Sequence, residues 1–321
     1  MSHSSLLNIK PLFSERSLVK LVTPSQQGSL LHFIKEVHEV VDDYLLTDGG
    51  ILLRGFDVPE EASFQEFARS FNFPLLNYEF GSTPRTELGD GVYTTTEYPA
   101  HQVIPLHNEQ AYTTNWPMKI WFHCITPSET EGETPIADSR QVFNKMDPEI
   151  RDMFERRKLK YVRNYGNGLD LPWQKVFNTD DPKQAELYCR SNQIDFEWKD
   201  DGELRTSQIC QGVARHPTTK EMVWFNQAHL FHVSNLQPNV RETLLSIVDE
   251  ADLPRNVYYG DGGVIEDAVL DEVRKVLDEC VVKFPWQSGD VLMLDNMLIA
   301  HSRSRFTGAR KVVVAMAEAN T

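Results

Sequence analysis

Three residues far apart in the sequence have the side chains needed to hold one metal ion. His107 and Glu109 are separated by a single residue, and His301 follows much later in the chain. Two imidazoles and one carboxylate are the ligand set that holds non-haem Fe(II) by one face and leaves coordination positions open for other ligands. If residues 107–109 lie on a β-strand, the side chains of His107 and Glu109 point to the same face and can bind the same ion.

Two further residues could bind a carboxylate near such a metal. Arg310 comes nine residues after His301 and opens the apolar segment 311–316, and its planar guanidinium suits bidentate carboxylate binding. Thr134 lies between the two histidines and could offer its hydroxyl to the same carboxylate. Taken one at a time, Arg310 is better explained as a surface cation and Thr134 as a turn residue, so the assignment depends on the combination.

Taken together, these residues resemble the taurine dioxygenase/clavaminate synthase-like family of Fe(II)/2-oxoglutarate-dependent oxygenases. The closest likeness is to the branch of syringomycin-type aspartyl hydroxylases. The resemblance covers most of the chain and rests on ordered blocks at residues 53–56, 81–86, 104–109, 132–135, 223–227, 259–262, 286–292 and 301–310.

The resemblance implies a role for each matching residue. It assigns His107, Glu109 and His301 to iron as the catalytic metal ligands, and Thr134 and Arg310 to the distal carboxylate of 2-oxoglutarate. The substrate contacts that we predict from the shared blocks are Arg85 and Asn226. The sequence departs from the family at Glu131, where relatives usually have a second glycine, which leaves the Thr134 hydroxyl in place but alters the loop before it.

The expected activity is hydroxylation of an unactivated C–H bond with Fe(II), 2-oxoglutarate and dioxygen as cofactors, a chemistry compatible with ascorbate as a reductant. Related halogenases replace the metal-binding carboxylate with a small residue, so Glu109 favours hydroxylation over halogenation. Desaturation and cyclisation use the same residues and stay open. The implied substrate is an amino acid or an amino-acid-derived group in secondary metabolism, either free or tethered to a peptidyl carrier protein.

Two other classes of protein fit part of the pattern. A metal hydrolase could use the same three ligands to activate a zinc-bound water, but that reading leaves Arg310 and Thr134 unexplained. A non-catalytic cupin-like protein that binds a small carboxylate would also retain these residues. Release of carbon dioxide from labelled 2-oxoglutarate distinguishes the three.

Other histidines and the cysteines are weaker candidates. His229 and His232 are three residues apart but lack a third ligand nearby, and we expect them to line a pocket rather than to bind metal. His101 and His123 are expected at the surface or in packing contacts. The four cysteines show no Cys-x-x-Cys spacing, which indicates reduced thiols in a cytoplasmic protein.

The pattern of apolar residues predicts strands and helices along the whole chain, and the family resemblance implies how they are arranged. The implied fold is mainly β with flanking helices, namely a double-stranded β-helix (a cupin-like jelly roll) with a large mixed insertion. We expect residues 1–321 to form a single domain in which about 140–280 is an inserted, lid-like region. Expected helices cover 27–46, 64–71, 148–157, 182–191, 239–250 and 265–279. Expected strands cover 51–56, 92–97, 119–126, 159–164, 203–210, 222–226, 281–286, 291–297 and 311–316.

Composition limits the partners. The formal net charge of −15 opposes nucleic-acid binding and counts mildly against docking on an anionic membrane. No apolar run is long enough to span a bilayer, and residues 1–5 do not resemble the start of a signal peptide. An acidic carrier protein would need a local basic patch, for which the clusters at 151–158 and 303–311 are candidates.

Overall fold

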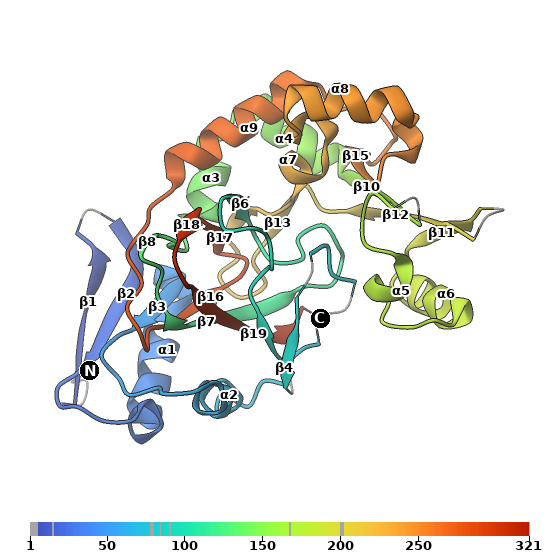
Figure 1. Cartoon of the computed structure of the whole chain (residues 1–321). Helices are drawn as coiled ribbons and strands as arrows, with labels where there is room; N and C mark the ends of the chain where they lie inside the picture. Colours follow the sequence, from blue (N-terminus) through green and yellow to red (C-terminus); the bar gives the residue numbers. More distant parts are fainter. Residues whose placement is uncertain are drawn as a thin grey trace.

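We describe the fold from a computed structural model, which covers residues 6–14, 16–77, 80–83, 85–89, 91–166, 168–199 and 202–320. Two features used above lie outside these residues, namely positions 1–5 and Pro84 of the block 81–86. Elements are labelled as in Figure 1.

The largest sheet in the described chain has eight strands. Their order is β1 (Leu7–Phe13), β2 (Arg16–Pro24), β3 (Gly50–Leu53), β16 (Val291–Asp295), β7 (Pro117–Thr126), β19 (Lys311–Ala319), β5 (Val92–Thr94) and β4 (Glu87–Gly89). Neighbours are antiparallel except β2 and β3. The central strands β16 and β7 are buried on both faces over most of their length. In β16 this burial appears in the sequence as the continuous apolar run 291–294, whereas β7 also buries Lys119 and His123.

A smaller sheet faces the large one and carries both candidate histidines. Its strands are β6 (Ile104–His107), β17 (Ile299–Arg303) and β9 (Ile136–Asp138), in that order. The rings of Phe122 in β7 and His301 in β17 have centroids 5.0 Å apart, so side chains of the two sheets meet. Apolar residues of both sheets, including Ile120, Ile136 and Val314, form the core between them. The short strands β8 (Thr130–Glu131) and β18 (Phe306–Thr307) pair beside this barrel.

Helices cover the outer face of the large sheet (Figure 1). They are η1 (Leu30–Phe33), α1 (Ile34–Asp48) and α2 (Glu61–Arg69). Apolar residues at helical spacing, such as Val37 and Leu45 of α1 and Phe64 of α2, pack in one cluster with Trp121 of β7. Gly49 ends α1 with a φ of 78°, which a glycine adopts without steric cost.

The region between the two halves of the smaller sheet forms a second body of mixed structure above and beside the barrel (Figure 1). A four-stranded sheet has the order β11 (Asp195–Trp198), β12 (Leu204–Cys210), β10 (Leu159–Tyr165) and β15 (Arg255–Tyr259), and β13 (Val213–Arg215) pairs with β14 (Met222–Trp224). The helices are α3 (Ser139–Lys145), α4 (Pro148–Arg157), α5 (Trp173–Val176), α6 (Pro182–Ser191), α7 (Ala228–Phe231), η2 (Val233–Asn235), α8 (Pro238–Ile247), η3 (Glu250–Asp252) and α9 (Asp267–Cys280).

This body shares its apolar core with the smaller sheet. Leu106 of β6, Ala137 of β9 and Ala300 of β17 belong to the same buried cluster as residues of β10, β15 and α9. The shared core supports the expectation of one domain, although the boundary of the inserted region stays a prediction.

Local sequence signals predicted several elements correctly. The helices at 148–157 and 182–191 have the expected bounds, and in both an aspartate caps the first turn ahead of a proline at the first helical position. The strand expected at 281–286 was wrong. Only Val282 pairs there, through a bridge to Ile136, and Pro285 has no N–H to continue the ladder.

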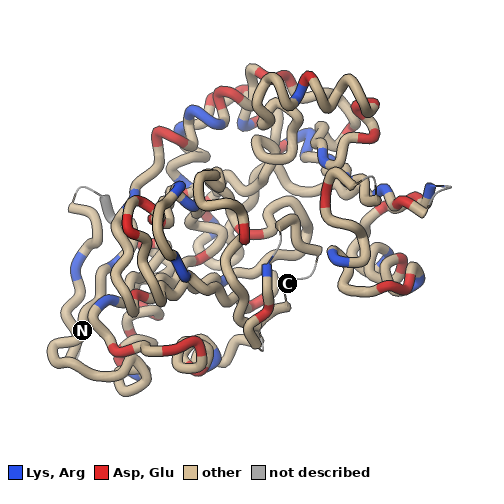
Figure 2. Tube along the Cα trace, in the orientation of Figure 1, with Lys and Arg blue, Asp and Glu red and all other residues tan. Residues whose placement is uncertain are grey.

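Acidic residues outnumber basic ones, 47 to 32. They are spread over the outer helices, including α9 at the top and α2 at the bottom of Figure 2. Within the described ranges, no helix combines the length and apolar character that crossing a bilayer requires. All four cysteines are buried free thiols.

Candidate metal centre

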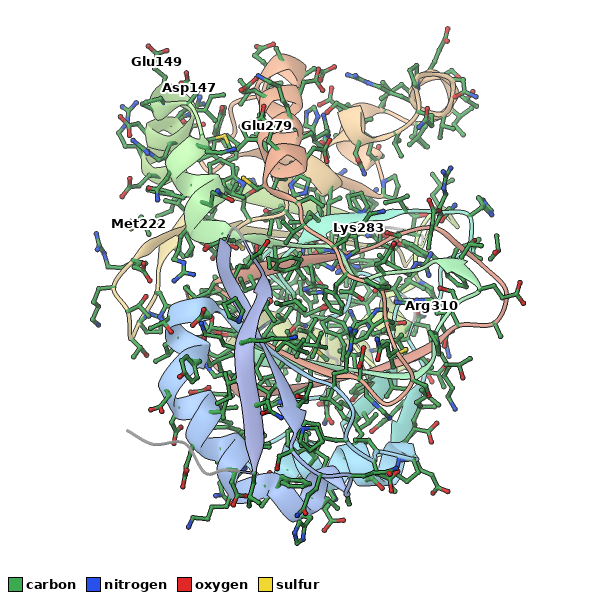
Figure 3. The ribbon with its side chains drawn as sticks, turned by 90° about the vertical axis from the view of Figure 1, so that its left-hand side faces the viewer. Asp147, Glu149, Met222, Glu279, Lys283 and Arg310 are labelled. Carbon is green, nitrogen blue, oxygen red and sulfur yellow. The ribbon has the colours of Figure 1, made fainter. Side chains whose placement is uncertain are left out.

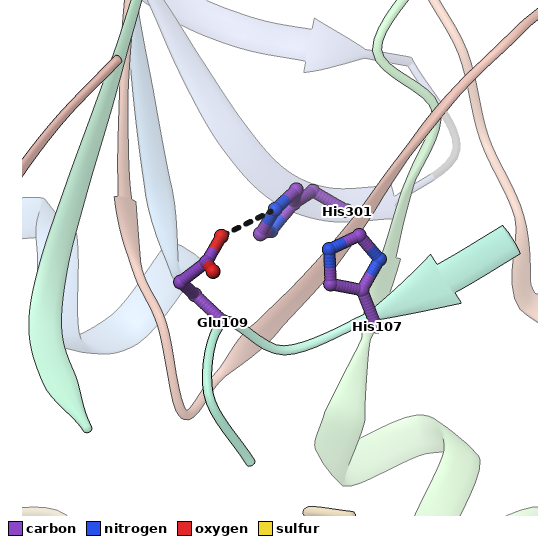
Figure 4. A group of neighbouring side chains, drawn as sticks. All are labelled: His107, Glu109 and His301. Atoms are coloured by element: carbon purple, nitrogen blue, oxygen red, sulfur yellow. Dashed lines mark ion pairs between the residues drawn. The ribbon is translucent and has the colours of Figure 1, made fainter. Parts of the chain in front are cut away.

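The two histidines of the proposed triad lie directly opposite each other in the smaller sheet. His301 of β17 pairs with His107 of β6 in the antiparallel register, and their ring centroids are 4.5 Å apart (Figure 4). Nδ1 of His107 donates to the carbonyl oxygen of Pro105 at 2.8 Å, which leaves Nε2 free to bind an ion. Burial and the neighbouring His301 lower the pKa of His107 to about 3, so its ring is in the neutral form that binds metals.

Glu109 reaches the same site by a different route from the one predicted. β6 ends at His107, so strand alternation does not orient the glutamate. Instead, the buried side chain of Asn296 holds its backbone: Glu109 N donates to Asn296 Oδ1 (2.7 Å), and Asn296 Nδ2 donates to Glu109 O (3.0 Å). The turn is thereby fixed so that Glu109 Oε2 lies 3.7 Å from His301 Nε2.

Further hydrogen bonds immobilise the residue between the two ligands. Asn108 Nδ2 donates to the carbonyl oxygen of Asn296 (2.6 Å) and to Ser139 Oγ (3.0 Å). Gln227 Nε2 donates to the carbonyl oxygen of Asn108 at 2.8 Å. Side chains from three distant parts of the chain therefore define the position of the turn.

Arg85 lies against the metal-binding carboxylate. Its Nη2 donates to Glu109 Oε2 at 2.7 Å, and both side chains are almost fully buried. Burial alone would raise the pKa of Glu109, but the charge of Arg85 and the nearby His301 ring hold it well below its usual range. Glu109 is therefore ionised, as a metal ligand must be. The predicted contact of Arg85 with substrate stays a prediction, while its contact with Glu109 was missed from the sequence.

The three side chains fit a divalent metal. One ligand atom from each of His107, Glu109 and His301 lies within 4.8 Å of the others. Nδ1 of His301 is buried and has no hydrogen-bond partner in the described chain. The other ring nitrogen, Nε2, faces Glu109 Oε2 and is the atom placed to share an ion with that carboxylate. Two imidazoles and a carboxylate with an open face suit Fe(II).

Arg310 and Thr134 lie beside the same barrel, and they fit the cosubstrate. Figure 3 shows Arg310 next to the sheet strands, far from Asp147 and Glu149 at the tip of α4. Arg310 Nε donates to the carbonyl oxygen of Gly132 (2.8 Å), two residues before Thr134. Thr134 is buried, and its Oγ1 accepts from Trp286 Nε1 at 3.1 Å, which leaves the hydroxyl proton available to a ligand.

Arg310 forms no direct ion pair within the described residues, although the charge of Glu133 acts on it. Burial and the neighbouring cation Arg303 lower its pKa to about 10, although it remains protonated at neutral pH. A part-buried cation without a direct ion pair is stabilised by a ligand that supplies a negative charge. The distal carboxylate of 2-oxoglutarate would do so.

Neighbouring arginines are occupied within the fold. Arg303 donates to the carbonyl oxygens of residues 96, 98, 99 and 102 and so fixes that loop. Arg305 is exposed and pairs with Glu131. Glu131 itself has a φ of 53°, in the left-handed region that favours glycine, which explains why relatives place glycine there.

The remaining candidates are placed away from the metal. Both polar atoms of the Asn226 side chain are hydrogen-bonded to the backbone, since Nδ2 donates to Gly212 O and Oδ1 accepts from Ala228 N. The next residue, Gln227, lines the metal cavity instead. His229 is buried and pairs with the carbonyl oxygen of Leu106. His229 and His232 each line a neighbouring cavity, as expected.

Asn296 and Gln227 are the positioning residues that the sequence analysis missed. A signal was present for Asn296, because Asp295 and Asn296 are polar residues inside the otherwise apolar stretch 291–300. Buried amides and carboxylates are retained only where they are hydrogen-bonded, so such a pair predicts a buried polar network. Gln227 gave no comparable signal.

Comparisons with known proteins agree with this arrangement. The profile of the family described as "Taurine catabolism dioxygenase TauD, TfdA family" matches residues 21–316. The chain is 41% identical to the dapdiamide synthesis protein DdaC of Enterobacter agglomerans, over 98% of this chain and 95% of that protein. It is 31% identical to a clavaminate synthase-like protein of Arabidopsis thaliana, over 88% and 86% of the two chains.

A solved structure with a similar fold is PvcB of Pseudomonas aeruginosa. The TM-score is 0.58 at 16% identity, and the match covers 99% of this chain and 93% of PvcB. PvcB is described as an Fe, alpha-ketoglutarate dependent oxygenase from an isonitrile synthetic pathway. The prediction of a jelly-roll fold with flanking helices is confirmed.

The Asn296 clamp gives a direct test of how Glu109 is positioned. We expect Asn296→Ala to weaken Mn(II) or Fe(II) binding about 10- to 100-fold, as loss of residues that orient metal ligands commonly does. Asn226→Ala is the matched control, because it also removes a buried amide bonded to backbone but leaves Glu109 in place. Equal metal affinity in both variants, measured by anaerobic calorimetry, would show that the clamp does not position the ligand.

Proposed function

The chain belongs to the taurine dioxygenase TauD, TfdA family, and from this premise we propose that it hydroxylates an unactivated C–H bond of an amino acid or amino-acid-derived substrate in secondary metabolism. It is a 2-oxoglutarate-dependent dioxygenase whose cofactors are Fe(II), 2-oxoglutarate and dioxygen. Two descriptions support the setting in secondary metabolism, namely dapdiamide synthesis for DdaC and an isonitrile pathway for PvcB.

The observation that carries the proposal is a cluster of two histidines and a glutamate on the same barrel as Arg310, which forms no direct ion pair within the described residues. His107, Glu109 and His301 would hold iron by one face. Arg310 and Thr134 would bind the distal carboxylate of 2-oxoglutarate, so that its other end reaches the iron. When bound, iron and 2-oxoglutarate supply with dioxygen the oxidising chemistry that breaks an unactivated C–H bond.

The protein supplies binding, orientation and exclusion of water. Arg85 and Asn296 fix the carboxylate ligand, and the rings of Phe122 and Phe231 help to enclose the site. Related halogenases replace this carboxylate with a small residue, and the halide takes the freed coordination position. In this chain Glu109 would occupy that position, which favours hydroxylation over halogenation. Desaturation or cyclisation is the alternative outcome of the same chemistry.

The region at about 140–280 is proposed to act as a lid on a single domain. Gln227, Phe231 and Arg255 from this region line the cavity that contains His107 and Glu109. The lid would exclude bulk water from the reaction. We also place the protein in the cytoplasm, which the four buried free thiols support.

The substrate is delivered either free or attached to a peptidyl carrier protein. The resemblance to tethered-aspartate hydroxylases supports the tethered form. The basic cluster at 303–311 does not offer a docking patch for an acidic carrier. Arg303 is buried, Arg305 pairs with Glu131, and Lys311 pairs with Glu61. An acidic carrier would therefore have to use the cluster on α4, where Arg157 is already paired with Asp261.

Turnover with candidate substrates tests the proposal. We expect the Fe(II)-loaded protein to release labelled carbon dioxide from 1-labelled 2-oxoglutarate, with strong stimulation by free or carrier-loaded aspartate and a mass gain of one oxygen in the product. Oxidation of other amino acids but not of aspartate would contradict the aspartyl assignment. Absence of carbon dioxide release with every substrate would contradict the enzymatic function.

Arg310 provides a test of cosubstrate binding. Hydrogen bonds to charged groups contribute roughly 1.5–3 kcal/mol, so Arg310→Gln should weaken 2-oxoglutarate binding about 10- to 100-fold while iron affinity stays unchanged. Arg305→Gln, at an exposed and paired position on the same segment, is the control and should behave like the native protein. An unchanged 2-oxoglutarate affinity in Arg310→Gln would place the anchor elsewhere.

A further inference from the structure

The cavity at the metal centre is small and adjoins a larger one. The metal cavity, which contains His107 and Glu109, has a volume of about 130 Å³. Ligand pockets for small organic molecules usually measure about 300–1,000 Å³. A substrate that fills a pocket of that size must therefore extend from the metal cavity into a neighbouring space.

One neighbouring space lies under α8 and has a volume of about 470 Å³. We call it the α8 cavity. It shares five lining residues with the metal cavity, so the two cavities adjoin. The shared residues are Tyr98, Leu230, Phe231, Asn235 and Arg255.

The walls of the α8 cavity are mainly apolar. Val240 and Leu244 face it from α8, and Leu253 and Pro254 face it from the segment before β15. Phe231 contributes an aromatic ring at the boundary with the metal cavity. Such a lining suits an aliphatic or aromatic group, because removing that group from water is favourable.

The charged residues at the boundary neutralise each other. Arg255 binds Asp170 through both Nε and Nη2, and Nη2 also donates to the carbonyl oxygen of Ser82. The side chain of Asp170 is only 10% exposed. A free carboxylate or ammonium would therefore find no unpaired partner in this ion pair, which favours an uncharged group in the α8 cavity.

Helix α8 covers the cavity without filling it. None of its ten residues is buried, and Val240 is 48% exposed although it lines the cavity. The ion pair of Arg241 with Asp267 ties the helix to α9. Apolar side chains that remain half exposed around an apolar space gain buried area when a ligand occupies that space.

A second neighbouring space carries more charge than the α8 cavity. It measures about 550 Å³, meets the metal cavity at Thr83 and Arg85, and has a mixed lining that includes Leu171 as well as Glu87 and Lys175. A free amino acid, which is charged at both ends, matches this mixed space better than the α8 cavity.

We propose that the α8 cavity binds an apolar arm of the substrate, so that the substrate is an amino-acid conjugate of the N-acyl or peptide type rather than a free amino acid. The apolar arm lies against Phe231, Val240 and Leu244, and the amino-acid part lies at the metal. The inference rests on the proposed function, because it places the group to be oxidised in the metal cavity.

Binding without turnover tests the proposal. The full chain is loaded with Mn(II) and N-oxalylglycine and titrated by calorimetry with N-acetyl-, N-butanoyl- and N-hexanoyl-L-aspartate. We expect the Kd to fall about fourfold for each added methylene that the cavity buries. Leu244→Trp, which fills the cavity, should remove this chain-length dependence and leave the Kd of the acetyl compound nearly unchanged.

Two further variants make the result decisive. Val240→Trp fills the same cavity from a half-exposed position and replaces Leu244→Trp if that variant does not fold. Ile247→Trp adds the same ring on α8 at a residue that is 66% exposed and outside the cavity lining, and it should keep the native dependence.

The proposal is overturned if the three compounds bind the native protein equally, if none of them binds, or if the cavity-filling variants keep the chain-length dependence. Failure of the proposed function would show differently, as a protein that binds these compounds but releases no carbon dioxide from 2-oxoglutarate.

Discussion

The pairing of β6 with β17 is the constraint on which the metal site depends. The antiparallel register sets His107 opposite His301, and a shift of one residue would turn one ring to the other face of the sheet. Asn296 reinforces this register, because it binds Glu109 through its side chain and accepts from Asn108 through its carbonyl group. The same contacts that define the barrel therefore define the distance between the metal ligands.

The charged residues of the site favour binding of both iron and 2-oxoglutarate. On the iron side, Glu109 is kept ionised by Arg85, and a metal ion adds positive charge to a carboxylate already prepared to bind it. On the cosubstrate side, Arg310 is a part-buried cation that forms no direct ion pair within the described residues. The negative charge of Glu109 is thus complementary to an iron ion, and the positive charge of Arg310 is complementary to a carboxylate of the cosubstrate.

The sequence contained much of this site and less of its geometry. The jelly roll was predicted correctly through the family resemblance, and the three residues proposed as metal ligands do lie together. The roles of Arg310 and Thr134 as carboxylate anchor stay a prediction. Strand alternation gave the right partners for Glu109 by the wrong mechanism, since the clamp by Asn296 joins residues nearly two hundred positions apart. The segment 281–286 was predicted as a strand because it is mainly apolar. In the structure it makes only a single bridge, at Val282, and Pro285 has no N–H with which to extend the pairing. Long-range hydrogen bonds and cavities arise from packing, which periodicity does not encode.

The measurement that tests the account most directly is the visible spectrum of the anaerobic protein with Fe(II) and 2-oxoglutarate. A chelate of the 2-oxo acid on iron held by this triad should give a weak metal-to-ligand charge-transfer band. The account predicts that His107→Ala and His301→Ala remove the band, while His101→Ala, at a histidine outside the site, keeps it. A band of native intensity in either ligand variant would contradict the assignment of the metal centre.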